Sequence, residues 1–129
     1  MLNCKTIDIE DALQAALNDA GYTACAIPVP TTLRNGQIVI RRTGGAQQQY
    51  VQDVHRVVFD CYESDEAGAM ALACNLTKTL RALEGETIGG VPVYRSSIIT
   101  LPYDNPDPDN HNHARATLFA EIVTRVIHD

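Results

Sequence analysis

The chain has 129 residues, of which 45% are hydrophobic and 20% are charged, and its formal net charge is −6 at pH 7. This length and composition predict one globular domain spanning residues 1–129, and they exclude wholesale disorder and a fibrous repeat. The negative charge disfavours specific nucleic acid binding, because the phosphate backbone would on average repel the protein.

The cysteines show neither a CxxC pair nor a companion histidine spacing of the zinc-finger type. They are Cys4, Cys25, Cys61 and Cys74. The amino terminus lacks the apolar stretch of a signal peptide, and the apolar runs fall well short of the ~20 residues that cross a bilayer. We therefore expect a cytoplasmic protein with reduced, mostly buried thiols, no metal or other cofactor, and no insertion into a membrane.

The first half of the chain predicts a helix and then strands. Apolar residues recur at helical spacing over residues 6–21, where Thr6 or Asp8 can cap the helix and Gly21 can end it. Two apolar stretches then flank Asn35-Gly36, a dipeptide typical of tight turns, which predicts a β-hairpin. Its first strand should be short and at a sheet edge, because Pro28 and Pro30 cannot donate ladder hydrogen bonds.

The sequence TGGAQQQ at residues 43–49 predicts a flexible polar loop, and it lacks the lysine of a phosphate-binding loop. The β-branched and aromatic residues of 51–63 then predict a central strand. His55 lies in register with Val57 and Phe59 on that strand. We interpret His55 as a hydrogen-bonded core or edge residue in preference to a ligand.

A long amphipathic helix follows, capped by Ser64 and stopped near Gly85. Strands are predicted at residues 91–101 and 114–127, the latter because its apolar residues alternate and many are β-branched. Together these elements predict an α+β fold: a mostly antiparallel sheet of about four to five strands with two helices packed on one face.

The connection between the last two strands, PYDNPDPDNHNHA, contains two histidines and three aspartates. His111 and His113 are two positions apart, so an extended chain would point both side chains the same way, as a metal site requires. The prolines, aspartates and asparagines are also typical of an ordinary loop, which is the interpretation we favour. The chain has no GxSxG, HExxH or GxGxxG motif, so we expect no enzyme.

Four segments in order carry a resemblance to a known family. They are R-x-T-G-G at residues 41–45, the strand VHRVVFDCY, the helix ESDEAGAMALACNLTKTLRALEG, and a Pro-Asp element before a strand ending in VTRV. In order, spacing and length, residues 37–127 resemble the tail terminator family of long-tailed bacteriophages, also described as minor tail or head-tail joining proteins.

The resemblance implies a structural role without chemistry. Such proteins form a hexameric ring that caps the tail tube, stops its polymerisation and joins the tail to neck proteins of the head. The implied partners are further copies of the chain, the tail tube protein and head-neck proteins. The implied location is the bacterial host cytoplasm during assembly and then the virion. An acidic surface suits a ring through which DNA must slide without binding.

By position, Arg42, Gly44 and Gly45 match the family's loop, and Asp107 or Asp109 matches its Pro-Asp element. Both long loops are expected to reach neighbouring subunits or the tube. The full set of expected interface residues is Arg41, Arg42, Gly44, Gly45, Gln47, Gln48, Asp104, Asp107, Asp109, His111 and His113. Two alternatives stay open: another neck component such as a head closure or connector protein, and a small enzyme that uses His55, His111 or His113.

Overall fold

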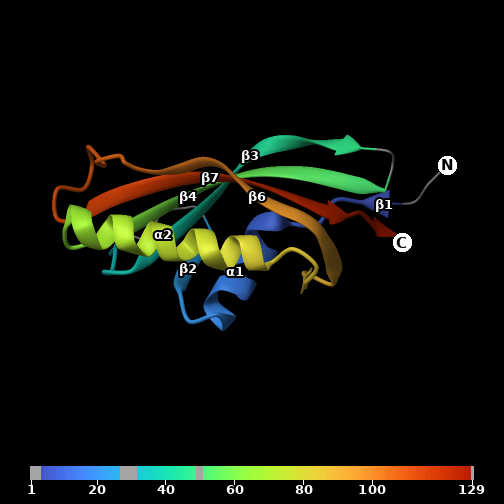
Figure 1. Cartoon of the computed structure of the whole chain (residues 1–129), viewed down its shortest axis with the longest axis horizontal. Coiled ribbons are helices and arrows are strands. Elements are labelled where there is room, and N and C mark those ends of the chain that lie inside the picture. Colours follow the sequence, from blue (N-terminus) through green and yellow to red (C-terminus); the bar gives the residue numbers. More distant parts are fainter. Residues whose placement is uncertain (1–3, 27–31, 49–50, 129) are drawn as a thin grey trace.

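The computed structural model describes residues 4–26, 32–48 and 51–128. In chain order its elements are β1 (Cys4–Lys5), α1 (Ile9–Asp19), β2 (Thr23–Ala26), β3 (Gln37–Gln48), β4 (Gln52–Glu63), α2 (Glu66–Ala82), β5 (Thr87–Ile88), β6 (Val91–Asp104), β7 (Ala114–Arg125) and β8 (Ile127–His128). Within these ranges, six strands form one sheet in the order β2-β3-β4-β7-β6-β5, and β1 pairs with β8 in a small second sheet. Figure 1 shows the long strands running along the longest axis of the molecule.

The α+β class is confirmed, whereas the expected strand number is too low and the sheet is mixed. The predicted hairpin at Asn35-Gly36 is wrong, because β2 runs parallel to β3, with Thr23 opposite Gln37. Gly36 does adopt a positive φ of 85°. Its N–H, however, donates to the carbonyl of Tyr62, so the turn brings the chain alongside β4. The chain does not reverse its direction against β2, as a hairpin would require. β2 lies at the sheet edge as expected; Pro28 and Pro30 fall outside the described residues.

The predicted loop is also wrong over residues 43–48, because β3 continues to Gln48, which pairs with Gln52 of β4; Gln49 lies outside the described residues. A register shift between Arg42 and Gly44 accommodates the glycines within the ladder. Gly45 has a φ of 151°, and a Cβ at this position would overlap the carbonyl oxygen of Val54. Gly45 therefore allows the close approach of β3 and β4, which form a long hairpin arm.

The later elements differ from their predicted bounds: β7 ends at Arg125, before the predicted end at residue 127, whereas β6 is longer than predicted. β6 continues through Asp104, past the predicted end at residue 101, so the connection to β7 comprises residues 105–113. Both predicted helices are present. Asp8 caps α1, as one of the two expected caps. α2 is capped by Asp65, whose Oδ1 accepts the N–H of Gly68 at 2.7 Å, and not by Ser64.

Both helices pack on the same face of the sheet, as predicted, and share one apolar core with it. Fully buried side chains come from α1, α2, β4 and β7, including Leu17, Leu80, Phe59 and Leu118. Each such side chain stabilises the fold by about 1.5–3 kcal/mol relative to an exposed one. Figure 1 shows α1 and α2 below the strands.

The cysteines differ in burial. Cys61 is buried, Cys25 is partly buried and Cys74 is exposed on α2, so the expectation of mostly buried thiols is wrong for Cys74. Burial is also the main reason that the pKa of the Cys61 thiol is raised. Over the described residues, neither helix has the length and apolar character needed to cross a bilayer.

Candidate interaction surfaces

The residues expected to make interfaces lie at two ends of the molecule. The β3–β4 arm, at the right of Figure 1, carries Gly44, Gly45, Gln47 and Gln48. The loop of residues 105–113, at the left, lies beside the start of α2. It carries Asp107, Asp109, His111 and His113, and Asp104 ends the adjacent strand β6. The structure therefore places these residues at an arm end and a loop end.

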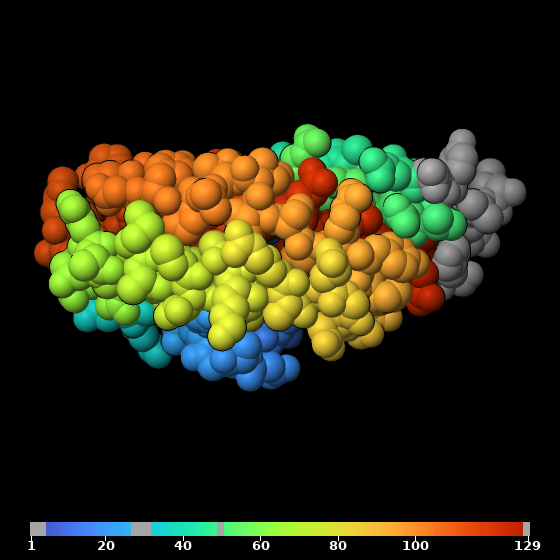
Figure 2. Space-filling view, in the orientation of Figure 1, coloured from blue at the N-terminus to red at the C-terminus, as the bar shows by residue number. Residues whose placement is uncertain are grey.

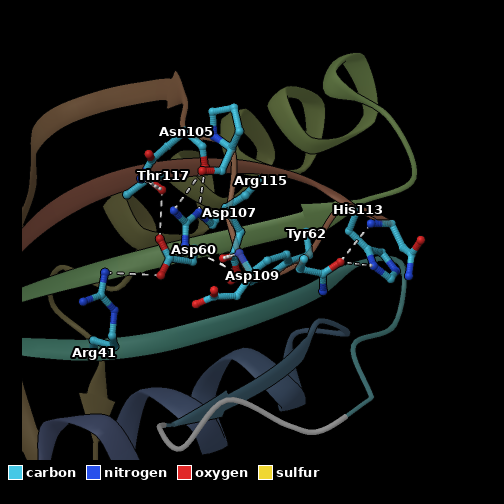
Figure 3. Close-up of polar contacts among 12 residues, drawn as sticks. Arg41, Asp60, Tyr62, Asn105, Asp107, Asp109, His113, Arg115 and Thr117 are labelled. Carbon is cyan, nitrogen blue, oxygen red and sulfur yellow. Dashed lines mark hydrogen bonds and ion pairs between the residues drawn. The ribbon is translucent and has the colours of Figure 1, made fainter.

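A buried carboxylate, Asp60, connects the sheet to the loop end (Figure 3). Asp60 is 3% exposed and accepts a hydrogen bond from the Thr117 hydroxyl at 2.8 Å. Its other oxygen lies 3.3 Å from the guanidinium of Arg41. Asn105 in turn donates to the Thr117 oxygen at 3.1 Å. Arg41 therefore neutralises a buried charge within the chain, although its side chain stays 43% exposed.

Asp107 forms a second internal contact at the loop end. Its Oδ2 accepts the hydroxyl of Tyr62 at 3.1 Å and lies 3.7 Å from Nη1 of Arg115. Its Oδ1 accepts the N–H of Asp109 at 2.9 Å, which closes a turn. Burial raises the pKa of the Tyr62 hydroxyl, with Arg115 opposing the shift and Asp107 adding to it. The phenol thus keeps its proton at neutral pH, and Asp107 anchors the loop to the sheet.

Arg115 completes this anchor. Its Nε donates to the carbonyl of Asn105 at 2.7 Å, and its Nη2 donates to that of Pro106 at 3.4 Å. Tyr62 and Arg115 face each other across β4 and β7. Sequence reasoning missed this group of residues. The alternation of residues 51–63 assigns Tyr62 to a strand face, but the pairing register that brings Arg115 opposite Tyr62 is not contained in either strand alone.

A polar hollow of about 420 Å³ lies between the loop and the start of α2. Ser64 and Glu66 line it on the helix side, and His111 and His113 line it on the loop side. His113 Nδ1 is 3.4 Å from the side-chain oxygen of Asn110. Across the described ranges, no three or more His, Cys, Asp or Glu side chains come together as metal ligands.

At the arm end, Arg42 connects β3 to the start of α1. Its backbone N–H donates to Glu10 Oε2 at 3.1 Å, and its guanidinium lies 3.7 Å from Glu10 and 3.8 Å from Asp8. Gly44, Gln47 and Gln48 are exposed beyond this contact. The arm therefore presents mainly uncharged polar side chains and bare backbone to other molecules.

His55 is a buried structural residue, which confirms the interpretation from the sequence. It is 6% exposed, and its Nε2 lies 3.0 Å from the hydroxyl of Thr124. Burial lowers its pKa; Asp53 opposes the shift and Arg42 adds to it. Asp53 itself is buried, and its Oδ2 has no hydrogen-bond partner in the described part of the chain.

His55 does not come together with the loop histidines. Glu63, which pairs with Ala114 at the end of the loop, is eight positions further along β4. At about 3.3 Å per residue this separates His55 from the loop end by roughly 26 Å. A single catalytic site that uses His55 with His111 or His113 is therefore not formed.

No protein-family model and no curated protein matches the sequence of this chain. The fold, in contrast, matches a chain in a solved structure described as the virion of a native gene transfer agent particle. The TM-score is 0.63 over 93% of this chain and 99% of that chain, at 14% sequence identity. At this identity the likeness shows a shared fold, present in a chain of a virion particle.

Proposed function

We propose that this protein is a structural component of a phage or phage-like virion, and specifically a tail terminator. As a hexameric ring it caps the tail tube, ends tail polymerisation and joins the tail to the head. One observation carries the proposal: nearly the whole of this chain shares its fold with nearly the whole of a chain from a gene transfer agent virion. The resemblance of residues 37–127 to tail terminators supports the same class from sequence alone.

The arrangement of the two ends suits a joining protein. A terminator must contact the tube on one side and head-neck proteins on the other, and such contacts require two separate surfaces. The arm end offers Gly44, Gln47 and Gln48, and the loop end offers Asp104 and Asp109, at opposite ends of the long axis. Each surface is exposed, so each is available to a different partner.

The polar residues support binding in preference to catalysis. Asp107 and Arg41 are engaged inside the chain, and His55 is buried far from the loop histidines. We therefore propose that the protein is not an enzyme. The net charge of −6 suits a ring that DNA passes without binding.

Assembly provides the first test. The purified chain, alone and mixed with tail tube protein, is measured by native mass spectrometry and imaged by electron microscopy. The proposal expects rings, in solution or on tube ends. A protein that stays at 14.1 kDa and is absent from tube ends would contradict it.

Binding to head portals without binding to tubes would instead indicate a head closure or connector protein. His111→Ala combined with His113→Ala provides the control for the enzyme alternative. A terminator with both changes still caps tubes.

A further inference from the structure

β6 has an open outer edge at the side of the sheet. β5 pairs only with its first two residues, and the backbone of Val93 bonds to Glu86 and Gly85. The N–H of Ser96 donates to Glu84. From Ser97 to Asp104, no hydrogen bond joins this edge to any other segment within the described ranges.

This edge is apolar, which is unusual for a strand at a surface. Ile99, Leu101 and Tyr103 are 52%, 66% and 40% exposed. The run SIITLPY at residues 97–103 contains no charged side chain. Edge strands usually carry charges that prevent pairing with other chains, so an uncharged apolar edge indicates a surface that is covered in the assembled state. In Figure 2 β6 lies at the surface along the upper margin of the molecule, beside α2.

The same chain has a second open edge on the other side of the sheet. β2 covers β3 only from Gln37 to Ile40, and the N–H of Arg42 donates to Glu10. From Thr43 to Gln48 the outer side of β3 has no partner among the residues described, and all of these residues are exposed. Among the residues that the structure describes, the sheet therefore has one unpaired edge at each side.

The directions of these two edges match. β3, β4, β7 and β6 are neighbours, and each pair is antiparallel, so β3 and β6 run in opposite directions. When copies stand side by side in the same orientation, β6 of one copy lies antiparallel to β3 of the next. The alternation of the sheet then continues without interruption, and such a head-to-tail contact closes into a ring when the rotation between copies permits.

We propose that the occupant of the β6 edge is a second copy of this chain, which pairs through residues 43–48 of its β3 with residues 97–101 of β6. Pro102 has no N–H to donate, which limits the pairing to residues before it. Antiparallel pairing of these segments centres Ile99 opposite Ala46. The inference rests on the proposed ring and identifies the contact that builds it. The pairing uses the backbone groups of residues 43–48, whose side chains project from the two faces of the sheet. The side chains of Gln47 and Gln48 at the arm end, and the loop end, therefore stay available to the tube and the head.

The first test adds charge to the edge. The double variant Ile99→Lys, Leu101→Lys is compared with Ala71→Lys, which adds a charge to the exposed side of α2. The pairing predicts that the double variant shifts from the ring to a 14.1 kDa monomer, whereas Ala71→Lys keeps the ring. Circular dichroism and a urea midpoint close to the parent's verify that the double variant is folded. A folded double variant that keeps the ring overturns the proposal.

The second test joins the two edges covalently and does not depend on loss of assembly. In a Cys74→Ser background, Ala46→Cys is combined with Ile99→Cys and oxidised under ring-forming conditions. Head-to-tail pairing predicts a ladder of covalent species up to the full ring. Each single cysteine variant, and Ala46→Cys combined with Asn75→Cys on α2, produces no such ladder. If the variant that combines Ala46→Cys with Ile99→Cys forms no ladder, the proposal is overturned.

The outcomes separate the contact from the function. If tubes are capped but no covalent ladder forms, the proposed edge pairing is wrong and the terminator function stands. If cross-linked rings form but do not change tube length, the edge pairing stands and the terminator function is wrong. A protein that is monomeric with and without tubes overturns the pairing.

Discussion

Replacement of Asp107 tests whether this residue anchors the loop from within the chain. Asp107→Ala removes the acceptor of the Tyr62 hydroxyl, which is 3.1 Å away, and leaves a buried donor without a partner. A hydrogen bond to a charged group contributes about 1.5–3 kcal/mol. The turn bond to the Asp109 N–H contributes about 1 kcal/mol more. The Arg115 pair is only 17% and 15% exposed, so losing Asp107 also removes the partner of a largely buried charge, which adds to the loss. The expected loss in the free energy of unfolding is about 3 kcal/mol.

The assay is urea unfolding at pH 7, with Asp109→Ala as the matched control. Asp109 lies in the same loop and is exposed, so its replacement should change the free energy of unfolding by less than about 0.5 kcal/mol. Tyr62→Phe should lose about 1 kcal/mol, a part of the Asp107 effect. Equal small losses for Asp107→Ala and Asp109→Ala would show that the anchor contributes nothing to stability.

Three further results are expected. Gly45→Ala should lower the free energy of unfolding in urea by about 2–4 kcal/mol, because the added Cβ overlaps a backbone carbonyl. Gly44→Ala has open space for a Cβ and should lower it by about 1 kcal/mol. Because the pKa of His55 in the folded state lies below 6.5, the free energy of unfolding should be at its full value above pH 6.5 and fall as the pH drops below it. His55→Gln should remove this part of the pH dependence, and an unchanged pH dependence would refute the lowered pKa of His55. In a Cys4→Ser background, a disulfide reagent should label Cys74 rapidly and Cys61 only on unfolding. Adding Cys74→Ser should abolish the fast phase, and persistence of that phase would contradict the assigned exposure.

The elements that sequence reasoning placed correctly are those with a strong local signal. α2 shows helical spacing of apolar residues along its whole length, and β4 shows a dense run of β-branched and aromatic residues. Asp8 can cap α1 because the capping contact spans only three residues. In each case the residues that make the element also contain the information that identifies it.

The errors arise where a partner distant in sequence decides the conformation. Asn35-Gly36 is a good turn, but whether it makes a hairpin depends on how β2 pairs with β3, and the pairing is parallel. Gly44 and Gly45 favour a loop by composition, yet the ladder with β4 holds them in a strand. The anchoring role of Asp107 depends on Tyr62, 45 positions earlier, and on the register that brings Arg115 beside it.

The most direct test of the proposed function measures the length of tail tubes. Tail tube protein is polymerised with increasing amounts of the purified chain, and tube lengths are scored by electron microscopy. We expect growth to stop once tube ends carry the protein, rings to be seen at those ends, and the double His111→Ala, His113→Ala variant to act equally well. Tubes that keep growing at an unchanged rate in the presence of excess protein would contradict the account.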